Sequence, residues 1–286
     1  MGLTALAIAC VAALVVQTIP PFTIVMATGP EGSAYYELGK RYRAKLAESG
    51  VKVRLVTTAG SPENLALLRD PRSGVNVSLL RGGASGAIGA HELESLGTIG
   101  YQPLWLFQRR GLRQSSGFPA LRGLKISIGP IGSGTWTLAR QLLKLNGIDE
   151  RVSELLTLMP EAAVEKLLAG EIDAMLTLNA WEAPVVQRLV SDERIEIANF
   201  QRADAYAALY PFLNKVVVPR GIADLAKDLP PTDVYLIAPK TSLVIRKDLH
   251  SAIQYLLLDA AVELHSEPGI FQQPISFPPP SRSTFP

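Results

Sequence analysis

Three loops rich in glycine and hydroxyl side chains recur along the chain, each between a strand-like run and a helix-like run. They occupy residues 28–35, 58–64 and 129–135. Glycine frees the backbone from the usual φ/ψ limits, and a helix start carries free N–H groups and a partial positive charge. Because ligands bind at the carboxyl ends of strands in open α/β sheets, the three loops together indicate a site for an anion.

The residues expected around this anion are small, carry a hydroxyl group or provide an aromatic wall. They are Thr28, Gly32, Ser33, Tyr35, Ser61, Gly132, Ser133 and Thr135. Helix capping explains the same hydroxyl groups without any ligand. Capping is most plausible at Ser61, which we predict to be an N-cap because Pro62 and Glu63 complete an ordinary helix start.

Two larger side chains extend the expected site. Arg81 ends a strand, where its guanidinium could bind a carboxylate through two hydrogen bonds or form a surface salt bridge. Trp181 follows the strand predicted over Ala174–Leu178 and either lines a cleft or packs in a core.

Other chemistries lack their required residues. Gly134 is followed by Thr135 and not by the lysine of a P-loop, and the first loop does not match a dinucleotide-binding glycine pattern. Ser85 sits in Gly-Ala-Ser-Gly-Ala, which misses the nucleophile elbow at its last residue. The three histidines lack metal-ligand spacing. The sequence therefore predicts no enzyme, no metal and no cofactor.

Composition limits the class of protein. The 286 residues are 48% hydrophobic and 19% charged, with a formal net charge of +2, which is typical of a folded chain of about two domains. No long basic run occurs, so nucleic acid is not an expected partner. The single cysteine, Cys10, lies in the apolar N-terminal run, so we expect no disulfide and no thiol chemistry in the folded part.

The N-terminal segment, residues 1–21, differs from the rest. No charged residue occurs before Glu31, and residues 3–16 are apolar except for Thr4. We expect a membrane anchor formed by residues 1–20, with a cleaved signal segment and a buried helix as alternatives. Whether Cys10 is lipidated stays open.

Alternating strand and helix patterns predict two α/β lobes with parallel strands covered on both faces. We expect the first lobe over residues 22–108 and 237–271, the second over residues 109–236, and a proline-rich tail over residues 272–286. The extended stretch Val234–Arg246, which we expect to be interrupted at Pro239, would return the chain to the first lobe.

Five segments give the chain a family resemblance: ATGPEGSAYYELG, TTAGSPENLALL, VSLLRGG, ISIGPIGSGTWTLARQLLKLNGI and LLAGEIDAML. In order and spacing they resemble the TAXI group of TRAP-transporter solute receptors. This resemblance implies a type II periplasmic-binding-protein fold that holds a glutamate-like amino acid or other small carboxylate between two lobes. It also implies an extracytoplasmic receptor that delivers its solute to TRAP-type permease subunits and catalyses nothing.

The chain departs from that family in two places. Many relatives end the third strand with Gln-Gly-Gly, whereas this chain has Arg81-Gly82-Gly83, and the added charge could favour a second carboxylate on the solute. Residues 179–184 are bulkier than the expected small-residue turn. Two alternatives therefore stay open, namely a membrane-anchored ligand sensor and, less favoured, an enzyme on the same scaffold.

Overall fold

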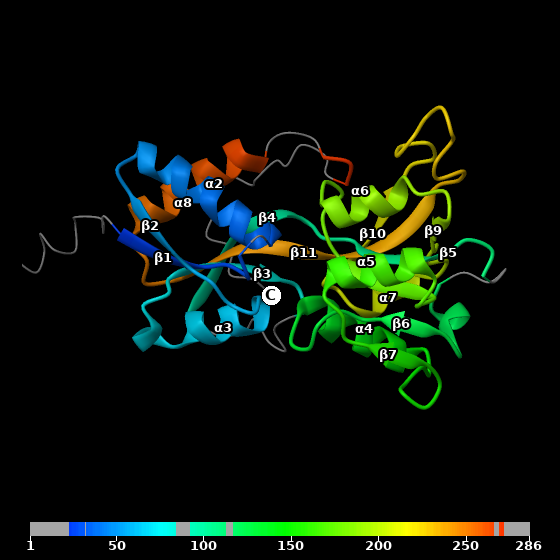
Figure 1. Cartoon of the computed structure of the whole chain (residues 1–286). Helices are drawn as coiled ribbons and strands as arrows, with labels where there is room; N and C mark the ends of the chain where they lie inside the picture. The colour runs from blue at the N-terminus through cyan, green and yellow to red at the C-terminus, as the bar shows by residue number, and fades with distance from the viewer. Residues whose placement is uncertain (1–22, 32, 84–91, 113–116, 266–268, 272–286) are drawn as a thin grey trace, which may run out of the picture.

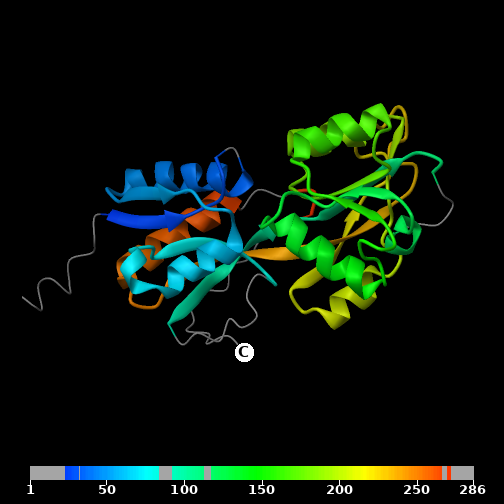
Figure 2. The ribbon, with the colours of Figure 1, turned by 60° about the horizontal axis from the view of Figure 1, so that its bottom comes forward.

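The computed structural model describes residues 23–31, 33–83, 92–112, 117–265 and 269–271. The predicted N-terminal helix, Gly32, Ser85 and the tail 272–286 lie outside these ranges. The described chain forms two lobes side by side, and one long strand passes between them (Figure 1). Figure 2 shows the same two lobes after a rotation of 60°.

The first lobe is a sheet covered on both faces by helices, as the alternating pattern predicts. Its strands and helices are β1 (Thr23–Ala27), β2 (Lys52–Val56), β3 (Val77–Arg81), β4 (Leu93–Tyr101), α2 (Ala34–Glu48), α3 (Ser61–Arg69) and α8 (Ser251–His265). Strand β1 pairs in parallel with β2 and β3. Helices α2 and α8 lie on one face of the sheet and α3 on the other (Figure 1). Apolar side chains of α2, such as the fully buried Tyr42, form the core beneath them.

The second lobe repeats this construction with its own apolar core. Its elements are β5 (Leu104–Arg109), β6 (Lys125–Ser127), β7 (Glu154–Leu156), β8 (Ala174–Leu178), β9 (Ile195–Ile197), β10 (Leu213–Val218), α4 (Gly134–Leu145), α5 (Pro160–Ala169), α6 (Pro184–Val190) and α7 (Ala203–Leu209). Strand β6 pairs in parallel with β7 and β8, whereas β5 is antiparallel to β8 and β9. The sheet is therefore mixed. Helix α6 begins at Pro184, after the turn that carries Trp181.

Strand β11 (Val234–Arg246) belongs to both lobes. Its first half pairs with β10, and its second half pairs with β3 and β4. The expected interruption at Pro239 is wrong. The Pro239 carbonyl accepts from Gln102 N at 3.2 Å, and the following Lys240 N donates to Phe212 O at 3.2 Å, so the hydrogen-bonded ladder continues past the proline.

Strand pairing also shows where the chain leaves the first lobe. Strand β5 lies in the second lobe, where Leu104 pairs with Leu178 of β8. The outgoing crossing is thus at residues 102 and 103, just before β5, and not near the expected limit at residue 108. The return crossing lies beside it in β11, around Pro239. Two adjacent crossings of this kind are the usual construction of a hinge between lobes.

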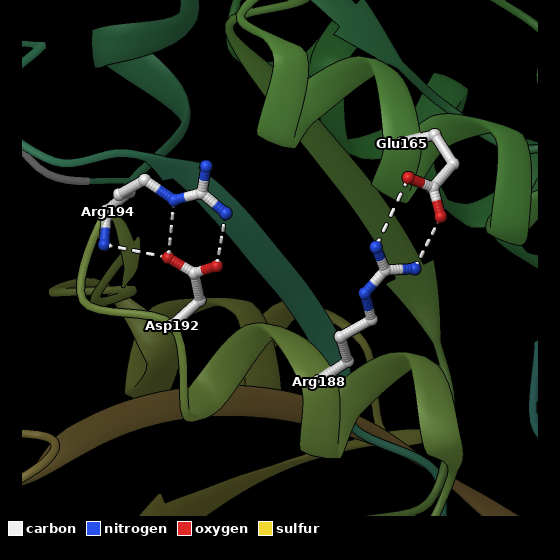
Figure 3. A network of polar contacts seen from close by, with 4 residues as sticks. All are labelled: Glu165, Arg188, Asp192 and Arg194. Carbon is white, nitrogen blue, oxygen red and sulfur yellow. Dashed lines mark hydrogen bonds and ion pairs between the residues drawn. The ribbon is translucent and has the colours of Figure 1, made fainter.

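The outer face of the second lobe carries exposed ion pairs (Figure 3). Arg188 of α6 contacts both carboxylate oxygens of Glu165 in α5, at 2.5 and 3.2 Å, and this hydrogen-bonded pair lowers the pKa of Glu165. Arg194 binds Asp192 in the turn after α6 and lowers the pKa of that carboxyl. Exposed pairs of this type contribute little to stability.

Candidate functional site

Arg81, at the end of β3 in the first lobe, reaches the start of α4 in the second. A Cβ built on Gly134, the first residue of α4, would lie only 1.4 Å from Arg81 Nη1 and 2.5 Å from Arg81 Cζ. The Arg81 guanidinium therefore rests against the backbone of Gly134. This contact brings together a strand end of the first lobe and a helix start of the second.

Neighbouring groups hold the Arg81 side chain in this position. Its Nε and Nη2 donate to Gln102 Oε1 at 3.2 and 2.9 Å, and its Cζ lies 5.9 Å from the centre of the Tyr35 ring. The Tyr35 hydroxyl lies 3.3 Å from Thr241 Oγ1 of β11, and this hydrogen bond fixes the position of the Tyr35 ring. Residues of α2, β3, the outgoing crossing and β11 thus converge on one guanidinium.

The electrostatics of this arrangement favour an anion. A helix N-terminus carries the equivalent of about +0.5 elementary charge, and Arg81 places a full positive charge against it. Gln102 supplies only a neutral oxygen to the guanidinium. Two positive groups in contact repel each other, so an anion bound beside this contact, within reach of both Arg81 and the start of α4, would relieve the repulsion and satisfy donors on both sides.

Ser33 and Ser133 are N-caps, as their positions in the sequence suggest. Ser33 Oγ accepts from Tyr36 N at 3.3 Å, and Ser133 Oγ accepts from Trp136 N at 3.1 Å. Both serines are partly exposed, so a hydroxyl hydrogen remains for a ligand. Gly132 precedes the second cap with φ of 81°, a conformation that glycine adopts readily.

The prediction that Ser61 is an N-cap is wrong. Gly60 occupies that position, and Ser61 is the first helical residue of α3. Its buried Oγ accepts from the backbone N of Arg81 at 2.9 Å, so Ser61 anchors the strand end that carries the arginine. Glu63 completes the helix start by accepting from Ala59 N at 2.6 Å.

Two other predicted hydroxyl groups already have backbone partners. Thr28 Oγ1 is buried and donates to Val56 O at 3.1 Å. Thr135 Oγ1 accepts from Leu178 N at 3.1 Å and ties α4 to β8. Both residues shape the loops that bear the capping serines, and direct ligand contacts by them stay predictions.

Trp181 lies beside the fully buried Trp105, with ring centres 5.9 Å apart, and packs on the core of the second lobe. Its carbonyl accepts from Gln187 Nε2 at 2.6 Å, which fixes the turn before α6. The ring is partly exposed, and its role as a cleft wall stays a prediction.

Sequence reasoning missed two features of this region. Gln102, nine-tenths buried, is the partner of Arg81 but has no motif around it. Phe212 of the second lobe packs on Gly82 and Gly83 of the first, where an added Cβ would lie 2.8 Å and 2.5 Å from Phe212 atoms. The glycine pair after Arg81 was the available signal, because paired glycines often permit a close approach.

Among the residues that the structure describes, no three His, Cys, Asp or Glu side chains gather into a metal-binding group. The described helices include none with the length and apolar composition needed to cross a membrane.

Solved structures share this two-lobed arrangement. The periplasmic aliphatic sulphonate binding protein SsuA of Escherichia coli has a TM-score of 0.52 and 14% identity, over 86% of this chain and 73% of its own. The effector binding domain of a BenM variant has a TM-score of 0.53 and 12% identity, over 85% and 94%. XAC2383 from Xanthomonas citri, bound to ATP, has a TM-score of 0.52 and 13% identity, over 87% and 85%.

At these identities the likeness establishes the fold alone, which is the α/β periplasmic-binding-protein-like fold with a mixed sheet. The sequence profile of the NMT1-like family matches residues 26–268, which is most of the chain and includes both lobes. The chain therefore belongs to the NMT1-like family.

Proposed function

We propose that this protein is an extracytoplasmic solute receptor that holds a small carboxylate between its two lobes and presents it to TRAP-type permease subunits. The anchor in this proposal is the apolar segment of residues 1–20. Motif order and spacing, which resemble the TAXI group, support the TRAP assignment. The fold shared with a periplasmic binding protein supports the extracytoplasmic location.

The observation that carries the proposal is the position of Arg81 against Gly134. A receptor needs groups from both lobes that a solute can join, so that binding favours the closed form. A carboxylate bound beside this contact would do this, because it could accept from both the Arg81 guanidinium and the start of α4. The capping serines, Ser33 and Ser133, would add hydroxyl donors, and Tyr35 a wall.

The charge of the site suggests which carboxylates bind best. Arg81 and the N-termini of α2 and α4 together supply the equivalent of about two positive charges. Glu31, the charged residue in the loop before α2, is exposed. A solute with two anionic groups would therefore balance the site better than a zwitterionic amino acid.

A ligand sensor on the same fold is the second candidate. The observation that favours it is the similar architecture of the BenM effector binding domain. Solute capture would be the same in both candidates, and only the membrane partner would differ. Co-purification of the full chain with permease subunits favours transport, whereas co-purification with a signalling protein favours sensing.

Calorimetry with the purified full chain tests the ligand. The panel holds glutamate, glutamine, 2-oxoglutarate, succinate, an aliphatic sulfonate, a neutral sugar and a nucleotide. We expect saturable one-to-one binding of a carboxylate, tightest for a dicarboxylate, with the solute recovered unchanged. Arg81→Gln should weaken it at least tenfold, because a charge-assisted bidentate contact is lost. Arg110→Gln, at an exposed arginine of the second lobe, is the matched control.

Binding confined to the sulfonate, the nucleotide or the sugar would overturn the carboxylate assignment. Turnover of a bound acid would favour the enzyme alternative. Unchanged carboxylate affinity in Arg81→Gln would remove the arginine from the site.

A further inference from the structure

A basic groove runs along the outer edge of the first lobe, beside β2. It has a volume of about 540 Å³, and its cationic lining residues are Arg43 of α2 and Lys52 and Arg54 of β2. Strand β2 is the outermost strand of the first-lobe sheet. The lining contains neither Arg81 nor Gly134, so the groove is distinct from the interlobe contact, although it extends to Glu31 in the loop before α2.

The charges of this groove are not balanced within the described residues. Arg43, Lys52 and Arg54 are exposed, and among the residues that the structure describes none of them has a carboxylate partner. Glu31 is the one acidic residue in the lining. Elsewhere on α2, by contrast, Lys45 binds both Glu48 and Glu263.

Protection of an open sheet edge explains only part of this pattern. Lysine and arginine on an edge strand prevent pairing with other strands, which accounts for Lys52 and Arg54. It does not account for Arg43, which lies on the helix, or for the shortage of acidic neighbours. An anionic partner explains all three cations through charge complementarity.

The course of the chain indicates which anionic partner is favoured. Thr23, the first residue of β1, also lines the groove. The 22 residues before it contain no charge, and residues 3–16 are apolar except for Thr4. An apolar segment that enters a bilayer immediately before Thr23 would bring the three cations to the lipid headgroups.

We propose that the groove docks on anionic phospholipid headgroups and sets the orientation of the receptor on its membrane. This inference uses the anchor of the proposed function but not its solute. The first lobe would rest on the bilayer through α2 and the edge strand β2, and the contact between Arg81 and Gly134 would lie outside the docked surface. Each basic residue near an anionic surface strengthens association by about fivefold, so the three together would contribute on the order of a hundredfold.

The test measures how fast lysines are acetylated in the full chain reconstituted in vesicles. One set of vesicles contains phosphatidylcholine alone, and the other also contains phosphatidylglycerol. Mass spectrometry follows Lys52 in the groove and Lys144, an exposed lysine of α4 in the second lobe. We expect Lys52 to react several-fold more slowly on the anionic vesicles and Lys144 to react equally on both. Roughly 1 M salt should restore the Lys52 rate, because it shortens the Debye length to ~3 Å.

A pair of matched variants separates the groove from overall charge. Arg43→Gln with Arg54→Gln should abolish the protection of Lys52. Arg110→Gln with Lys144→Gln, which removes the same charge from the second lobe, should leave it unchanged. Equal acetylation of Lys52 on both vesicle types overturns the proposal, as does protection that persists in the Arg43/Arg54 variant.

Flotation with neutral vesicles measures membrane association through the anchor, residues 1–20, without any contribution from anionic headgroups. If the chain floats with neutral vesicles and Lys52 is not protected on anionic ones, the anchor stands and the docking surface fails. If the chain floats with neither type, the docking surface fails together with the anchor. Solute binding measured in detergent is independent of both results.

Discussion

Gly134→Ala tests the contact on which the candidate site depends. The new methyl group would lie 1.4 Å from Arg81 Nη1, far below any real contact distance, so the guanidinium must leave its position. The backbone itself tolerates the change, because Gly134 is not among the glycines with positive φ. The variant therefore moves one side chain of the opposite lobe without straining the mutated residue.

Two opposing effects set the magnitude. Displacement of Arg81 removes its hydrogen bonds to Gln102 Oε1, and bonds that involve a charged group contribute about 1.5–3 kcal/mol. Alanine stabilises a helix by up to about 1 kcal/mol relative to glycine. We expect a net loss of about 0.5–2 kcal/mol in the free energy of unfolding, and Tm falls by about 2–4 °C per kcal/mol for chains near this size.

A double-mutant cycle with Arg81→Ala isolates the contact. In that background the guanidinium is absent, so Gly134→Ala should be neutral or stabilising by up to about 1 kcal/mol. The assay is urea unfolding of the four proteins, with carboxylate affinity measured on each. We expect a coupling energy of about 1.5–3 kcal/mol. A coupling energy below about 0.5 kcal/mol, which is the additivity expected of independent sites, would refute the interlobe contact.

Three further predictions concern a cap, a lobe interface and a titrating group. Ser133→Ala removes the N-cap of α4 and should lower the free energy of unfolding by about 1 kcal/mol. It should also weaken carboxylate binding at least tenfold. A loss of stability with unchanged affinity would limit the serine to capping. Gly83→Ala should lower the free energy of unfolding in urea more than the control Gly111→Ala. Both glycines have positive φ, so both variants strain the backbone, but only Gly83→Ala would bring a Cβ to 2.5 Å from the Phe212 ring. Equal losses would contradict this interface. Burial lowers the pKa of His265 to about 4, so the unfolded chain, with an ordinary pKa near 6.5, binds more protons between these values. The contribution of His265 to stability is therefore complete above about pH 6.5 and declines by on the order of 1–2 kcal/mol as the pH falls to about 4. His265→Gln should flatten the dependence of the free energy of unfolding on pH between these values. An unchanged dependence would contradict the burial of His265.

Local patterns in the sequence predicted much of the fold correctly. The alternation of apolar strands and amphipathic helices predicts two α/β lobes, and the structure has β8 over the expected residues, Ala174–Leu178. The cap positions of Ser33 and Ser133 were also readable. These features depend on hydrogen bonds and side-chain periodicity within a few residues, and such short-range effects are visible in sequence alone.

Errors arose where a local pattern competed with a distant partner. Ser61 has the local pattern of an N-cap, but its hydroxyl binds the backbone of Arg81, 20 residues away. Pro239 has the local signature of a strand break, yet long-range pairing carries β11 through it. Residues 104–108 were assigned to the first lobe, although they pair with β8 in the second. A long-range hydrogen bond leaves no periodic trace in the segment that makes it.

Local patterns are sufficient to predict two α/β lobes with glycine- and serine-rich helix starts, and to place Arg81 at the end of a strand. The contacts of Arg81 with Gly134 and Gln102, and the packing of Phe212 on the glycine pair of the other lobe, are visible only in the folded chain. Capping and strand formation depend on neighbouring residues. The meeting of two lobes, by contrast, depends on the crossing strand β11, whose paired residues in β4 and β5 lie more than 130 positions earlier in the chain.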